Sequence, residues 1–185
     1  MIAICPLPHF DAERFKAIAS GYTTSAIYRV TWLDDTEQAS FTLTREALPE
    51  PKAFRFPFSD EEFAHYRAIV PGDYCLAAYA GEEAVGVAIA ESQEWNNVLW
   101  VWDFHVAEVF RGQQIGRRLM DALAVKAKEA GLRAIVCETQ NTNTPAIDFY
   151  RAVGFKMEGV DISYYTNDDM LPGSTVAVFM KRRLA

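Results

Sequence analysis

Two hydrophobic periodicities alternate along the chain, one with the spacing of a helix and one with the spacing of a strand. Apolar residues recur at helical spacing over 115–130, which predicts an amphipathic helix ending at Gly131. On either side, the runs 98–106 and 133–139 are aliphatic and aromatic, as buried strands are. Because a helix separates them, we expect these two strands to lie parallel.

The remainder of the second half predicts an antiparallel meander and a closing pair of strands. The expected elements are strands over 74–80 and 85–91 that lead into 98–106, a helix from Pro145 to Val153, and strands over 155–161 and 175–181. Gly154 closes the helix. The sequence therefore predicts a mixed sheet flanked by helices.

The first 72 residues have a weaker pattern. The expected elements are a helix over 11–20 with Asp11 as its N-cap, strands over 27–33 and 40–47, and a helix from Ser59 to Val70. Ser59 and Glu62 form the capping box of the second helix. Pro49, Pro51 and Pro57 predict an irregular segment between these elements.

Length and composition agree with one domain over 1–185. The chain has 185 residues, of which 50% are hydrophobic, enough for one sizeable core. No apolar run reaches the ~18 to 20 residues of a membrane span. The first residues lack the basic and apolar regions of a signal peptide. We therefore expect a cytoplasmic protein that does not bind membranes.

Charge and cysteine content exclude some partners. The net charge of −7 disfavours nucleic acid, since a binding face needs clustered Lys and Arg, and it mildly favours a cationic substrate. Cys5, Cys75 and Cys137 lie far apart without a CxxC pattern, so we expect neither a disulfide framework nor a bound metal. A homodimer is compatible with the sequence.

The loop at 110–117 carries the most informative chemistry. It reads F-R-G-Q-Q-I-G-R and lies between a predicted strand and a predicted helix. The N–H groups and the positive dipole at a helix start bind phosphate, and Arg111 and Arg117 can add charge-assisted bonds. Neither the nucleotide motif G-x-x-x-x-G-K-[ST] nor the dinucleotide motif G-x-G-x-x-G is present.

This loop, R-G-x-x-I-G, resembles the pyrophosphate loop Q/R-x-x-G-x-G/A of the GNAT superfamily of acyl-CoA-dependent N-acyltransferases. Some thirty residues on, Asn143, Ala146, Phe149-Tyr150 and Gly154-Phe155 resemble the second part of its signature, N-x-x-A-x-x-F-Y-x-x-x-G-F. The run E-T-Q-N-T-N, followed by Gly159, Asp161 and Tyr164, is similar to streptothricin acetyltransferases. The resemblance covers residues 85–184.

The resemblance implies the GNAT fold, a mixed α/β sheet whose two central parallel strands splay apart around the pantetheine arm of acetyl-CoA. It implies an acceptor side at 1–72 and a cofactor-binding core at 73–185. In the core it assigns backbone contacts with pantetheine to Phe104, His105 and Val106. It assigns the pyrophosphate to Arg111, Gly112, Gln113, Gln114, Ile115, Gly116 and Arg117.

Gln114 departs from the family pattern, in which glycine is usual. Glycine lets the backbone approach phosphate and adopt conformations that are costly for other residues. We still expect the loop to bind CoA.

The predicted helix after Asn143 carries the second group of site residues. Asn143, Ala146 and Tyr150 have the spacing of one helix stripe, whereas Phe149 and Val153 face the core. The resemblance counts Asn143, Ala146 and Phe149 among the cofactor-binding residues. It makes Tyr150 the general acid that protonates the departing thiolate.

Carboxylates on the predicted strands are the candidates on the acceptor side. The attacking amine must lose the proton of an ammonium whose pKa is about 10. Asp103 and Glu138 lie on the two central strands, and Glu91 and Asp161 on flanking ones. We expect Glu138 and Asp103 to bind the amine and to accept its proton, with His105 as the alternative base.

These residues predict an N-acetyltransferase that moves acetyl directly from acetyl-CoA to a primary amine of a small cationic molecule, such as a streptothricin-like compound. Two alternatives stay open: an acetyltransferase of protein or peptide amines, and a non-catalytic acyl-CoA-binding module. Gln114 is the feature that favours the module, and Tyr150 is the feature that opposes it.

Overall fold

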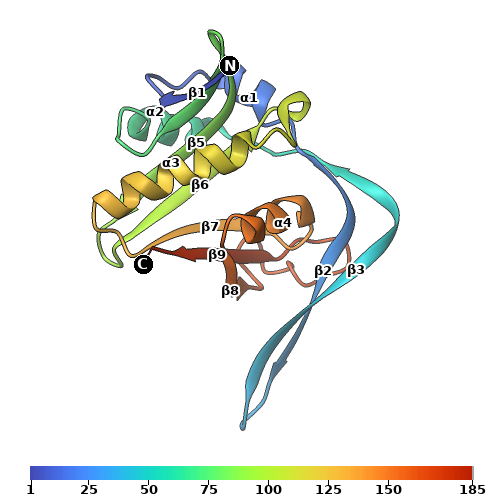
Figure 1. Ribbon diagram of the computed structural model, residues 1–185. Coiled ribbons are helices and arrows are strands. Elements are labelled where there is room, and N and C mark those ends of the chain that lie inside the picture. Colours follow the sequence, from blue (N-terminus) through green and yellow to red (C-terminus); the bar gives the residue numbers. More distant parts are fainter. Residues whose placement is uncertain (185) are drawn as a thin grey trace. The chain divides into compact units, whose positions relative to one another are not determined.

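The computed structural model describes residues 1–184 (Figure 1). The chain forms two compact units. Unit 1 comprises Met1–Gly21, Arg55–Cys137 and the chain from Arg182 on. Unit 2 comprises Tyr22–Phe54 and Glu138–Lys181.

Unit 1 contains a sheet and three α-helices. Its elements are β1 (Ile2–Pro6), α1 (Ala12–Ile18), α2 (Asp60–Ile69), β4 (Leu76–Ala80), β5 (Glu83–Gln93), β6 (Val98–Val106), the short 3-10 helix Glu108–Phe110, α3 (Ile115–Glu129) and the start of β7 (Ala134–Gln140). The strand order is β1-β4-β5-β6-β7. β4, β5 and β6 form an antiparallel meander, and β6 is parallel to β7. The predicted meander and parallel pair are confirmed.

Helices pack on the sheet of unit 1 through the apolar positions that the periodicity predicts. Leu119, Met120, Leu123 and Ala127 of α3 are fully buried, and α3 contacts β1, β4, β5 and β6. The N-caps are also as expected, with Asp11 capping α1 and the Ser59–Glu62 capping box opening α2. α1 ends at Ile18, two residues before the predicted end.

Unit 2 contains a separate two-stranded ribbon, one helix and a strand pair. Its elements are β2 (Tyr22–Asp34), β3 (Ala39–Phe54), the end of β7, α4 (Thr144–Ala152), β8 (Lys156–Asp161) and most of β9 (Ala177–Arg183). β2 and β3 pair only with each other in the described chain, and β9 lies between β7 and β8. β8 and β9 are antiparallel.

The segment at Pro49 and Pro51 is irregular in its pairing, as predicted, but it does not separate two elements, because β3 continues to Phe54. The register between β2 and β3 shifts between Thr24 and Ala26, and residues 48–51 fall outside the paired positions. Proline lacks the N–H group that would donate to a neighbouring strand. At an unpaired position no such bond is needed, so the strand tolerates both prolines. Pro57 lies outside any strand, as expected.

The strand β1 was not predicted. Its five residues pair antiparallel with β4, from Ile2↔Ala80 to Pro6↔Leu76. A strand this short at a sheet edge depends on the neighbour that pairs with it rather than on its own pattern. No helix in the described part of the chain is long and apolar enough to cross a membrane.

Candidate active site

In unit 1, the loop before α3 adopts the conformations that its glycine-rich sequence suggests. Gly112 has a φ of +77°, and a Cβ atom at this position would meet no heavy atom within 4 Å. Gln114 is the N-cap of α3 and lies in the left-handed region, with φ 64° and ψ 5°. Residues that carry a side chain rarely adopt this backbone conformation, which explains why the family pattern favours glycine at the position of Gln114.

The start of α3 presents backbone donors. The helical hydrogen bonds begin with Arg118 N, which donates to Gln114 O at 3.0 Å. The N–H groups of Ile115 and Gly116 come before this first bond and so have no acceptor within the helix. The first turn of α3, all of which the structure describes, has no acidic residue. This donor set and the helix dipole suit a phosphate or pyrophosphate.

Two arginine side chains at the loop and the start of α3 donate to backbone carbonyls of unit 1. Arg111 Nε donates to Val106 O at 3.0 Å, and Arg111 Nη2 donates to Gly21 O at 3.1 Å. Arg118 Nη2 donates to Ile2 O at 2.9 Å. The guanidinium of Arg111, which the sequence assigns to phosphate, therefore binds backbone carbonyls while leaving its positive charge at the loop.

The end of β6 carries the three residues expected to contact pantetheine through their backbone. Phe104, His105 and Val106 pair with Ala88, Val87 and Gly86 of β5, respectively. The register of β6 with β7 runs only from Val98↔Ala134 to Val101↔Cys137. Beyond Val101, the described pairing of β6 is with β5 and no longer with β7. This agrees with the expectation that the backbone of residues 104–106 contacts pantetheine.

Asp103 is held by two neighbours in unit 1. The Tyr66 hydroxyl of α2 donates to Asp103 Oδ2, and His105 Nε2 lies 2.6 Å from Asp103 Oδ1. The Asp103 and His105 side chains are 13% and 11% exposed. Burial, and then the charge of Asp103, raises the pKa of Tyr66 well above its usual value.

The ring of His105 is enclosed by aromatic side chains. The centroids of Phe56, Phe15 and Phe58 lie 5.0, 5.7 and 6.4 Å from the imidazole centroid. The His105 side chain is therefore largely enclosed by aromatic rings and lies within hydrogen-bond distance of a carboxylate, and Asp103 is the more exposed of the two by a small margin.

In unit 2, Asn143 begins the helix that carries Tyr150. Asn143 Oδ1 accepts a bond from Ala146 N at 3.2 Å, and Asn143 is 6% exposed. Pro145 lies in the first turn, where its missing N–H costs no bond. The cap uses the carbonyl oxygen of the Asn143 amide, so the group left for pantetheine is the NH2.

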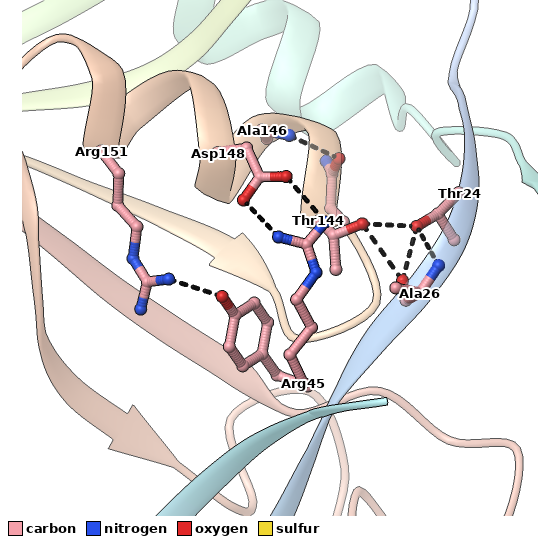
Figure 2. Close-up of polar contacts among 9 residues, drawn as sticks. Thr24, Ala26, Arg45, Thr144, Ala146, Asp148 and Arg151 are labelled. Carbon is pink, nitrogen blue, oxygen red and sulfur yellow. Dashed lines mark hydrogen bonds and ion pairs between the residues drawn. The ribbon is translucent and has the colours of Figure 1, made fainter. Parts of the chain in front are cut away.

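Side chains of the ribbon fix α4 in place (Figure 2). The contacts are Thr24 Oγ1 with Thr144 Oγ1 at 2.6 Å, Arg45 with both Asp148 oxygens at 3.0 and 2.9 Å, and Arg151 Nη1 with the Tyr28 hydroxyl at 2.5 Å. They come from both strands of the ribbon and from successive turns of the helix. The orientation of α4 within unit 2 is thus set over its whole length.

Tyr150 is buried on this helix, with 6% of the residue exposed. Its ring centroid lies 5.5 Å from that of Phe149 and 5.2 Å from that of Phe155. Phe149 is half-buried and Val153 is buried. Tyr150 thus lies on the buried face of α4 with Thr144 and Ile147, whereas Ala146 is partly exposed and Phe149, which was predicted to face the core, is only half-buried.

Glu138 of β7 lies in unit 2 among tyrosines. The Tyr165 hydroxyl, from the loop between β8 and β9, donates to Glu138 Oε1. Burial, and then the charge of Glu138, raises the pKa of Tyr165 well above its usual value. The same two causes raise the pKa of Tyr164.

Sequence reasoning did not find Tyr66 and Tyr165, which bind the two candidate carboxylates. Tyr66 is 37 residues from Asp103, and Tyr165 is 27 residues from Glu138. For the pair of Tyr165 and Glu138, the sequence did offer one indication, namely two adjacent tyrosines, Tyr164 and Tyr165, in a polar loop. Within the described residues, no group of three or more His, Cys, Asp or Glu side chains is arranged to hold a metal ion.

Comparison with known proteins identifies relatives of the chain. The model of the acetyltransferase (GNAT) family matches residues 33–155. A streptothricin acetyltransferase of Streptomyces lavendulae is 32% identical over 84% of this chain and 82% of its own length. The crystal structure of nourseothricin acetyltransferase superposes with a TM-score of 0.75 and 27% identity, covering 100% of this chain and 99% of the other.

A second solved structure has the same fold. It is a Bacillus anthracis protein in complex with acetyl coenzyme A, with a TM-score of 0.73 and 21% identity, covering 99% of both chains.

Proposed function

The chain belongs to the GNAT family of acetyltransferases, and we propose that it acetylates a primary amine of a small cationic molecule of the streptothricin type. The co-substrate is acetyl-CoA. The observation that carries the acceptor class is the 32% identity to a streptothricin acetyltransferase over most of both chains. The acidic net charge of −7 supports a cationic acceptor.

In this proposal the donor-rich start of α3 binds the pyrophosphate of acetyl-CoA, and the end of β6 binds pantetheine through its backbone. The neutral amine attacks the thioester carbon, and the tetrahedral intermediate collapses to an amide and a thiolate. Tyr150 donates its hydroxyl proton to that thiolate, which yields CoA as the free thiol. Asp103 and Glu138 are the carboxylates for binding the amine, and one of the two accepts its proton.

The geometry of the loop supports a working cofactor site in spite of Gln114. The side chain does not prevent the left-handed turn that the family makes with glycine. Tyr150 favours catalysis over a non-catalytic module, because it supplies a phenol proton, and three separate side-chain contacts with the ribbon hold its helix.

The test is acetyl transfer to three acceptors, followed by mass spectrometry and by release of the CoA thiol. The acceptors are streptothricin, a cationic peptide with a free N-terminus, and a control in which the streptothricin amines are already blocked. We expect one added acetyl group per released thiol on streptothricin and none on the control. Transfer to the peptide alone would replace the proposed acceptor class, and binding of acetyl-CoA without any transfer would favour the non-catalytic module.

A further inference from the structure

The surroundings of Glu138 in unit 2 combine one carboxylate with aromatic rings. Tyr165 donates its hydroxyl to Glu138 Oε1. Tyr164 and Tyr22 lie close enough for the charge of Glu138 to affect them: after burial, which is the larger cause, that charge raises the pKa of each phenol. One phenol therefore binds this carboxylate directly, and two more lie within the range of its charge.

Two of the rings are accessible to a ligand. Tyr164 and Tyr165 are 45% and 41% exposed, and their centroids lie 5.3 Å apart at an interplanar angle of 84°. Tyr164 also packs edge-on against Phe179, with a centroid distance of 5.5 Å. A carboxylate beside exposed tyrosine rings is the combination that binds organic cations, through charge and through cation–π contact.

The loop that carries these rings is fixed by a buried carboxylate. Asp169 is 3% exposed and accepts bonds from Tyr165 N at 2.9 Å, Thr166 N at 2.9 Å and Thr166 Oγ1 at 2.8 Å. Burial acts to raise the pKa of Asp169, but these hydrogen bonds outweigh it and the pKa is lowered. These bonds hold the backbone of the loop at Tyr165 and Thr166, which reduces the entropy cost of binding a ligand there.

The bond from Tyr165 also bears on what Glu138 can do. A hydrogen bond donated to a carboxylate stabilises its charged form. A carboxylate in this state is suited to holding a group that stays positively charged. The amine that receives acetyl must instead become neutral before it attacks.

We infer that Glu138, Tyr164 and Tyr165 bind a second cationic group of the acceptor, one that keeps its charge through the reaction. This inference rests on the proposed acetyl transfer and specifies its substrate: acceptors carry at least two positive charges. Glu138 is then an anchor for the acceptor, and accepting the proton falls to another group.

The kinetic test compares two amines with the same carbon chain, cadaverine and pentylamine, because only cadaverine keeps an ammonium after it is acetylated. We expect kcat/KM for cadaverine to exceed that for pentylamine by about ten- to a hundredfold in the wild-type chain, the range that one cation–π and charge-assisted contact supplies. Glu138→Gln should remove this preference, and Tyr164→Leu should reduce it. Glu50→Gln, the same exchange at an exposed position of β3, should leave it unchanged.

A binding measurement separates this inference from the proposed function. Choline carries a permanent charge and cannot be N-acetylated, so its binding needs no acetyl transfer. Calorimetry should detect choline binding to the wild-type chain and a loss of at least about tenfold in affinity in Glu138→Gln. Equal use of both amines, or equal choline binding by both chains, overturns the inference. Absence of acetyl transfer to any amine, with choline still bound, would instead overturn the proposed function and leave a cation site.

Discussion

The start of α3 offers a ligand mainly backbone groups, whereas the surroundings of Asp103 and Glu138 offer side chains. At the loop, Arg111 binds carbonyl groups of the chain itself, and the N–H groups of Ile115 and Gly116 remain ahead of the helical ladder. Each of the two carboxylates instead accepts a hydrogen bond from a tyrosine hydroxyl that comes from a distant part of the sequence.

This difference separates binding of the cofactor from recognition of the acceptor. A backbone site depends on a local conformation, and any sequence that adopts it can bind phosphate. A side-chain site depends on the identity of each residue. Substitutions at the loop should therefore act on CoA affinity, and substitutions in the tyrosine and carboxylate groups should act on turnover, selectivity or stability.

Tyr150→Phe should have the largest effect, because it removes a group proposed to act only in the transition state. General acid catalysis contributes about 10²- to 10⁴-fold, so kcat should fall by that range while the affinity for acetyl-CoA changes little. Single-turnover kinetics and calorimetry measure the two quantities separately.

The matched control for Tyr150→Phe is Tyr79→Phe, which removes the hydroxyl of a half-buried tyrosine of β4 in unit 1. This hydroxyl has no assigned part in the site, so its loss should leave kcat near that of the wild-type chain. A Tyr150→Phe variant with wild-type kcat would reduce Tyr150 to a packing residue.

Tyr66→Phe should lower the free energy of unfolding by about 1–3 kcal/mol at neutral pH, since it takes a hydrogen bond from the largely buried Asp103. Urea denaturation measures this change. Tyr74→Phe, a half-buried tyrosine just before β4, serves as the control and should change stability little. Equal stability of the two variants would show that the bond to Asp103 contributes nothing.

The same residue gives the chain a pH dependence. The pKa of Tyr66 is raised, so its phenol stays protonated in the folded chain where an unfolded tyrosine, with a pKa of about 10, ionises. The folded chain then holds more protons, and stability should be fully present below about pH 10 and fall above it. Tyr66→Phe should show a smaller alkaline loss, with the remainder due to groups such as Tyr165, whose pKa is also raised.

Gln114→Gly should have the smallest effect. Glycine relieves the left-handed conformation at φ 64°, which should raise stability by up to about 1 kcal/mol, and CoA affinity should be kept or improved. Gln113→Gly is the control: its φ is not positive, so glycine should cost about 0.5–1 kcal/mol there. A large loss of CoA affinity in Gln114→Gly would show that this side chain is itself a ligand.

The sequence predicted the elements that are set by local pattern. The helix at α3, the meander of β4 to β6 and the caps at Asp11 and Ser59 all follow from periodicity or from residues within one turn. The strand at β1 and the continuation of β3 through Pro49 and Pro51 did not follow, because they depend on a partner strand and on a register shift.

The candidate site divides along the same line. The phosphate loop is contiguous, so its glycines and the following helix could be recognised together. The partners of the carboxylates could not, since Tyr66 comes to Asp103 from 37 residues away and Tyr165 to Glu138 from 27. A sequence names the carboxylates on the strands, but only the fold shows which phenols bind them.

The most direct test of the backbone site compares the binding of CoA and pantetheine by calorimetry, in the wild-type chain and in Gly116→Glu. Pantetheine lacks the pyrophosphate, and the new carboxylate would lie where that group is proposed to bind. Val125→Glu adds the same charge at an exposed position of α3 and serves as the control. We expect CoA to bind the wild-type chain at least about a hundredfold more tightly than pantetheine, and Gly116→Glu alone to remove that advantage while leaving pantetheine binding unchanged. Equal affinity of the wild-type chain for both ligands, or an equal loss for both in the variant, would contradict a pyrophosphate site at the start of α3.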